Sequence, residues 1–199
     1  MVADNMRRRV VRKDEPNGAW ICRGQGGLTL VETLIAVVIG IIILVGAFIV
    51  AGQVLSNNRL SNTETDIASI EGGVKQLYAG QGNYNGLTNQ VAINAGVFPA
   101  DMVGTGAPVD SWQGAVTLEP GTALSSNFGG DFAIQMASVS QSACIKLATY
   151  QYGTWVAFSI NGTSLYSPGN PIAAGSSPTP LASGDCTPGS TNTLLWIVG

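Results

Sequence analysis

The longest apolar run in the chain covers residues 34–51, where eighteen consecutive residues carry no charged or hydrogen-bonding side chain. A helix rises ~1.5 Å per residue, so this run is long enough to span the ~30 Å hydrocarbon core of a bilayer. Glu32 stands at the leading edge of the run, five residues after the Gly-Gly pair that ends at Gly27. An ionisable side chain placed there is costly in lipid and needs a partner.

Helical periodicity continues beyond the apolar run. Five apolar residues recur at helical spacing among Asn, Thr, Glu and Asp, namely Ile67, Ile70, Val74, Leu77 and Tyr78. There is no proline between Pro16 and Pro99 to stop a helix. The pattern predicts one helix from about residue 28 to about residue 79, apolar on all sides at first and then amphipathic. We expect it to end near Gly80, and the stripe to pack against a sheet.

The pattern changes after this helix to short runs with strand-like periodicity. Residues 81–114 are predicted to be a long connection with a short helical turn around residues 89–95. Strands are expected at residues 115–119, 132–138, 144–150, 154–160 and 193–198, with residues 150–154 as a hairpin connection. The last run, TLLWIV, is too apolar for an edge and is predicted to be a central strand. The fold class is therefore α+β, a long helix packed on an antiparallel sheet.

Two further segments have the composition of turns and loops. Asn161-Gly162-Thr163 fits a glycosylation signal but is better explained as a turn, since Asn-Gly favours tight hairpins. Residues 167–192 are rich in proline, glycine and serine, and are predicted to form a surface excursion held by Cys186.

Charge is divided unevenly along the chain. Residues 1–27 contain six basic and three acidic residues, a net charge of +3, whereas residues 28–199 contain three basic and nine acidic residues, a net charge of −6. The positive-inside rule places the basic flank in the cytoplasm and the acidic remainder across the membrane. Such an acidic portion is a poor binder of nucleic acid. The chain has no histidine, and no catalytic, metal-binding or cofactor-binding motif is recognisable.

The cysteine count is consistent with export. Cys22 lies in the basic segment, so removal of that segment leaves Cys144 and Cys186 as an even pair. In an oxidising compartment this pair is predicted to form a disulfide that closes the C-terminal region. The alternative is two free buried thiols.

The segment GQGGLTLVETLIAVVIGIIIL, residues 24–44, resembles the processing site and membrane helix of type IV pilins and of the related type II secretion pseudopilins. The resemblance rests on Gly26 and Gly27 before the cut, Leu28 as first mature residue and Glu32 as fifth. The long leader, the non-phenylalanine Leu28 and the cysteine span are similar to the type IVb class of enteric colonisation pili and conjugative thin pili. The helix-breaking proline usual in type IVa membrane helices is not found here.

The resemblance implies a prepilin that a prepilin peptidase cuts after Gly27 and methylates on Leu28. It further implies three regions: a cleaved basic leader (1–27), a transmembrane and assembly half of the helix (28–55), and a globular pilin head (56–199). Glu32 would neutralise the new amine of Leu28 on a neighbouring copy within a helical homo-oligomer. An inner-membrane assembly platform would convert the membrane-stored subunit into an extracellular fibre for adhesion, aggregation or mating contact.

Two alternatives are left open by the sequence. A type II secretion pseudopilin or a minor pilin would share the same motif. A membrane-anchored periplasmic binding protein that never polymerises would keep the apolar helix without processing at Gly27.

Overall fold

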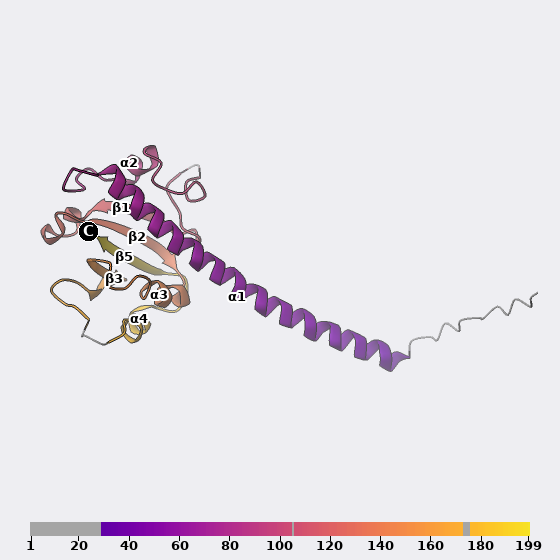
Figure 1. The fold of residues 1–199 in the computed structure, drawn as a ribbon. Helices are drawn as coiled ribbons and strands as arrows, with labels where there is room; N and C mark the ends of the chain where they lie inside the picture. The colour runs from indigo at the N-terminus through magenta and orange to yellow at the C-terminus, as the bar shows by residue number, and fades with distance from the viewer. Residues whose placement is uncertain (1–28, 105, 173–175) are drawn as a thin grey trace, which may run out of the picture. The chain divides into compact units, whose positions relative to one another are not determined.

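The computed structural model describes residues 29–104, 106–172 and 176–199. The chain divides into two compact units, residues 1–46 and residues 47–199. The first unit contributes the beginning of helix α1, and the second contributes the rest of α1 together with a sheet and short helices (Figure 1).

Helix α1 runs without interruption over Leu30–Leu77, 48 residues, which confirms the predicted long helix. At its C-terminal end the N–H of Tyr78 still bonds the carbonyl of Val74, and Gly80 then takes a φ of +84°. Only glycine adopts this left-handed conformation readily, so the helix ends where the sequence predicts. Gly73 serves a different purpose, because a Cβ there would lie 3.0 Å from Cγ1 of Val97. Its missing side chain lets the loop at Val97 pack against the helix.

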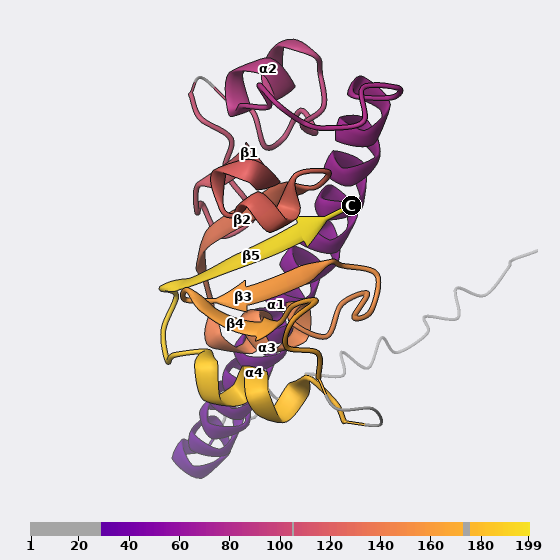
Figure 2. The same ribbon diagram turned by 90° about the vertical axis from the view of Figure 1, so that its left-hand side faces the viewer.

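Five antiparallel strands form one sheet in the order β1-β2-β5-β3-β4 (Figure 2). Their bounds are β1 Val116–Pro120, β2 Phe132–Val139, β3 Ala157–Ile160, β4 Thr163–Tyr166 and β5 Asn192–Val198. Strand β5 pairs with β2 on one side and with β3 on the other, so Trp196 faces Ile134 in one register and Phe158 in the other. The prediction of a central strand at residues 193–198 is confirmed.

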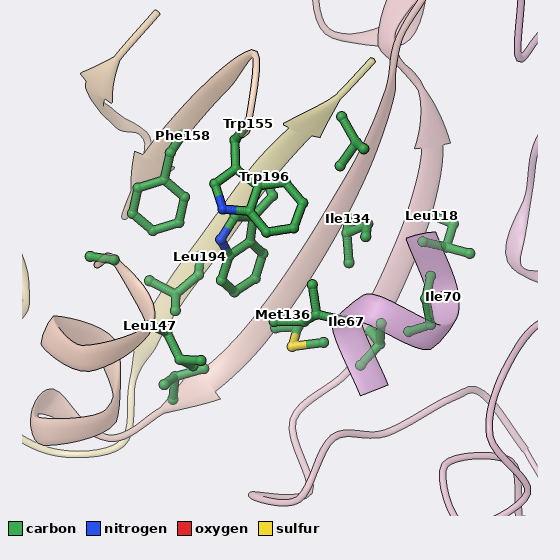
Figure 3. Close-up of a cluster of buried hydrophobic side chains, with 14 of the residues drawn as sticks. Ile67, Ile70, Leu118, Ile134, Met136, Leu147, Trp155, Phe158, Leu194 and Trp196 are labelled. Carbon is green, nitrogen blue, oxygen red and sulfur yellow. The ribbon is translucent and has the colours of Figure 1, made fainter. Parts of the chain in front are cut away.

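The core lies between the C-terminal half of α1 and one face of the sheet. Ile67, Ile70 and Val74 are fully buried, which confirms the role predicted for the amphipathic stripe. Figure 3 shows Ile67 and Ile70 of α1 facing Met136 and Leu118 of the sheet. Burial of apolar side chains of this size contributes ~1.5–3 kcal/mol each, so the stripe fixes the helix on the sheet.

The β3–β4 hairpin closes at Asn161-Gly162. Both residues have positive φ, 52° and 83°, the conformation that a two-residue turn between antiparallel strands requires. The interpretation of this dipeptide as a turn is confirmed. Strand β4 itself was not predicted, because its four residues alternate only weakly.

The prediction of a strand at residues 144–150 is wrong, since residues 144–147 belong to helix α3, Gln141–Leu147, and residues 148–150 form a turn. Its buried residues Ala143, Cys144 and Leu147 follow helical spacing, and a short apolar run of this kind does not distinguish strand from helix. The predicted hairpin at residues 150–154 is therefore also wrong, because these turn residues connect α3 to β3.

Four further helical segments lie outside the sheet. Helix α2 covers Asn89–Asn94, close to the predicted helical turn, and two 3-10 turns, η1 (Gly121–Ala123) and η2 (Ser126–Phe128), connect β1 to β2. Helix α4, Thr179–Asp185, was not predicted and falls within the excursion at residues 167–192. It begins with Pro180 in its first turn, where proline costs no hydrogen bond.

Candidate assembly site at the start of the long helix

Thr29 caps the N-terminus of α1. Its carbonyl accepts the first helical hydrogen bond from the N–H of Thr33 at 3.1 Å, and its Oγ1 accepts from the N–H of Glu32 at 3.3 Å. Thr29 and Glu32 thus have the spacing of a capping box, with Glu32 at the third helical position. This cap is not among the predicted features, although the spacing Thr-x-x-Glu before an apolar run is its usual sequence signal.

Glu32 lies in the first turn of α1 with its side chain exposed. The N–H groups of a first turn have no helical partners and carry partial positive charge, so a carboxylate is favourable there. This arrangement leaves the carboxylate accessible to a group from another chain. Of the residues predicted to act in processing and assembly, Gly26, Gly27 and Leu28 lie outside the described residues, so the structure places Glu32 alone.

The helix surface that follows Glu32 is apolar and exposed. An 18-residue window of α1 reaches a mean hydropathy of 3.3 with none of its residues buried, long and apolar enough to cross a membrane. Leu30 is 80% exposed and Phe48 is 74% exposed. An apolar surface of this length is stable only in lipid or against other apolar helices.

The second predicted site, the disulfide, is confirmed. Cys144 of α3 and Cys186, which caps α4, are joined with their Cα atoms 6.0 Å apart, and both residues are buried. The bridge fastens α4 to helix α3. The sequence instead predicts a strand at Cys144, so this part of the prediction is wrong.

Asn192 anchors the segment that follows the disulfide and was missed from the sequence. It is fully buried, and its Nδ2 donates to the carbonyls of Val139 and Thr187, each at 3.0 Å. Its Oδ1 accepts from the N–H of Thr187 at 2.7 Å and from Nδ2 of Asn161 at 3.0 Å. The disulfide loop, the β3–β4 turn and the start of β5 are thus held by one side chain.

Comparisons with known proteins match both the start of the long helix and most of the chain that follows. A family model described as "PilS N terminal" matches residues 57–199, and the model of the prokaryotic N-terminal methylation motif matches residues 22–48. Comparison with curated proteins finds no match.

The fold is shared by solved structures of type IV pilins. A type IV b pilin from Salmonella typhi is 24% identical with a TM-score of 0.50, over 70% of this chain and 97% of that one. TcpA, a type IV pilin from Vibrio cholerae El Tor biotype, is 15% identical with a TM-score of 0.51, over 71% of this chain and 99% of that one.

Proposed function

Since the chain belongs to the PilS family of type IV pilins, and is a structural subunit of a pilus rather than an enzyme, we propose that it matures by cleavage after Gly27 and polymerises through Glu32 into an extracellular type IVb fibre. The observation that carries this proposal is the exposed carboxylate of Glu32 in the first turn of a helix whose following surface is apolar and exposed.

Cleavage after Gly27 creates the charge that Glu32 needs. A prepilin peptidase would release the basic leader, residues 1–27, and methylate the amine of Leu28. That amine would stand four residues before Glu32, ~6 Å along a helix. The match of the methylation motif to residues 22–48 supports this position for the cut.

Pairing between copies then sets the register of assembly. An amine or a carboxylate left unpaired among apolar helices costs several kcal/mol. In a bundle of α1 helices, the Glu32 carboxylate of one subunit neutralises the Leu28 amine of its neighbour. A polar pair within an apolar bundle fixes axial register, because any slip separates the charges.

The exposure of side chains along α1 supports different roles for the two parts of the chain, membrane anchoring and assembly for residues 28–55 and a surface-exposed head for residues 56–199. Residues 28–55 would anchor the prepilin in the inner membrane and later form the inner layer of the fibre, where their apolar surface is covered. Residues 56–199 would form the exported head, with the disulfide-linked segment on its surface. An assembly platform in the inner membrane would move the subunit from one state to the other.

Intact-mass measurement of the protein from sheared surface fibres and from the membrane fraction tests the proposal. We expect the fibre species to begin at methylated Leu28 and to be two hydrogens lighter for the Cys144–Cys186 disulfide. Unprocessed chain confined to membranes would instead identify an anchored protein that does not polymerise. Processed chain that never enters the fibre fraction would identify a pseudopilin.

A further inference from the structure

A small cavity lies between the second half of α1 and the loops that precede β1. Its volume is about 260 Å³, and its polar lining comprises Arg59 and six residues with oxygen-bearing side chains, Asn62, Asp66, Asp101, Asp110, Ser111 and Gln113. Asn62 and Asp66 are one helical turn apart on α1, whereas the other four come from the long connection after α2. Oxygen-bearing side chains from two distant parts of the chain therefore meet around one space.

Asp66 is buried without a protein partner. It is 6% exposed, and among the described residues its side chain forms neither a hydrogen bond nor an ion pair. Burial of a carboxylate costs hydration free energy unless another charge or a hydrogen-bond donor compensates. Since Asp66 lines the cavity, its oxygens are available to a ligand there.

Asp110 is the second buried carboxylate, 3% exposed. Its Oδ1 accepts hydrogen bonds from the N–H groups of Trp112 and Gly114, each at 2.8 Å. Its Oδ2 is buried and has no hydrogen-bond partner among the described residues. The backbone thus holds Asp110 in a fixed orientation and leaves one oxygen unused.

Burial raises the pKa values of two of the aspartates around the cavity, Asp66 and Asp110. Burial, together with the charges of Asp101 and Asp110, raises the pKa of Asp66 to about 6. Burial also raises the pKa of Asp110, although its two backbone hydrogen bonds oppose this effect. Folding therefore gathers three carboxylates, those of Asp66, Asp101 and Asp110, around one cavity, an arrangement that a bound cation would neutralise.

We propose that this cavity is a calcium site with Asp66 and Asp110 as its charged ligands. Calcium takes six to eight oxygen ligands in flexible geometry, and it accepts carboxylates, amide oxygens and water together. Among the described residues, no three acidic side chains are arranged to hold a metal ion. The remaining positions would therefore be filled by water and by the neutral oxygens of Asn62, Ser111 and Gln113.

The ligand chemistry favours calcium over other ions. The lining offers neither the thiolates nor the imidazoles that zinc prefers, and its one sulfur atom is the thioether of Met102. Magnesium requires a near-ideal octahedron and sheds water reluctantly, whereas a site with few charges and several neutral oxygens suits weak calcium binding. Sites of this type in extracellular modules have Kd values of ~0.1–1 mM. A bound ion would tie α1 to the connection at residues 101–113.

Arg59 provides an internal test, because it lines the same cavity and forms no ion pair with the described carboxylates. Its guanidinium lowers the affinity for a metal cation by repulsion. Replacement by Gln should therefore strengthen calcium binding. If Arg59 were instead the cation that the cavity holds, the same replacement would destabilise the protein without improving calcium binding.

Thermal unfolding and titration calorimetry of the full chain in detergent micelles, after treatment with EDTA, test the calcium site independently of fibre assembly. With 5 mM CaCl₂ at matched ionic strength, we expect Tm to rise by about 3 °C, with a smaller rise for MgCl₂. Asp66→Asn should remove the rise. This variant breaks no hydrogen bond of the described structure, so it is expected to fold. Asp185→Asn, the same change outside the cavity, should keep the rise.

Three results would overturn the proposal. They are the absence of a calcium response in the wild-type protein, an equal response to magnesium, and a full response in a folded Asp66→Asn protein. A Tm that rises on acidification but does not respond to calcium would mean that protons alone neutralise the cavity, which also contradicts the proposal.

Discussion

The N–H of Glu32 donates to Oγ1 of Thr29, so the residue predicted to pair subunits also stands in the capping turn of its own helix. These two functions require different properties of the side chain. A capping box is satisfied by an uncharged acceptor, because Gln serves in it as well as Glu. Charge pairing with an amine requires the carboxylate, and substitution at this position can therefore separate the two functions.

Glu32→Gln should abolish or strongly reduce fibres while leaving the helix and the processing at Gly27 intact. Loss of the carboxylate leaves the Leu28 amine of the neighbour unpaired, at a cost of several kcal/mol, so fibre yield should fall at least tenfold. Sheared-fibre yield and intact mass measure the two effects. Glu64→Gln, on the same helix beyond the apolar segment, should assemble normally. Normal piliation by Glu32→Gln would mean that Glu32 acts as a cap alone.

Cys186→Ser should destabilise the head. The lost bridge closes a loop of 43 residues, since its cysteines are 42 positions apart, and the chain-entropy model gives a loss of ~4 kcal/mol. Subunit levels in membranes and Tm in detergent under non-reducing conditions measure the effect. Cys22→Ser, which changes only the leader, should leave both unchanged. Equal Tm values for wild type and Cys186→Ser would show that the bridge adds no stability.

Acidification should stabilise the protein when calcium is chelated. Asp66 has an ordinary pKa of 3.8 that the fold raises to about 6, so between these values the folded state holds a proton that the unfolded state releases. Stability contributed by this group is therefore gained as pH falls from 7 towards 4. Tm should be higher at pH 5 than at pH 7.5, by about 2–4 °C for each kcal/mol gained. Asp66→Asn should flatten this dependence, and an unchanged slope would assign it to other groups.

Two glycines should respond to alanine in opposite directions. A Cβ at Gly72 in α1 meets nothing within 4 Å, so Gly72→Ala should stabilise the helix by about 0.5–1 kcal/mol. A Cβ at Gly114 would clash with the carbonyl oxygen of Ala137, so Gly114→Ala should force the backbone apart and destabilise the head by about 1–3 kcal/mol. Denaturant unfolding of the two variants measures both effects. A stabilising Gly114→Ala would show that β2 can move away.

The sequence predicts best the elements that have strong local signals. The uninterrupted apolar run, the stripe from Ile67 to Val74 and the Asn161-Gly162 turn each have one dominant physical interpretation, and the structure agrees with all three. Helix α3 was misread because seven residues are too few to separate the two periodicities. Helix α4 was missed because its proline and glycine suggest a loop, whereas its position depends on the disulfide.

The assembly site at Glu32 could be predicted only in part, because only one of its two partners has a local signal in the sequence. Glu32 stands out because a carboxylate beside an apolar run is costly wherever it lies. The partner that would neutralise it belongs to another copy of the chain, so periodicity within one chain does not reveal it. The cavity at Asp66 and Asp110 could not be predicted from the sequence, because the two carboxylates are 44 positions apart and are brought to one cavity only by the packing of α1.

The position of β5 between β2 and β3 has a consequence for export. Strand β5 follows all four other strands in sequence and pairs with β2 and β3, so in the proposed export β1–β2 and β3–β4 would remain two separate hairpins until residues 192–198 had crossed the membrane. Isolated two-stranded hairpins are at best marginally stable in water. Folding of the sheet therefore waits for the last strand, and a chain truncated before Asn192 presents two unjoined strand edges, which are prone to pair with other chains.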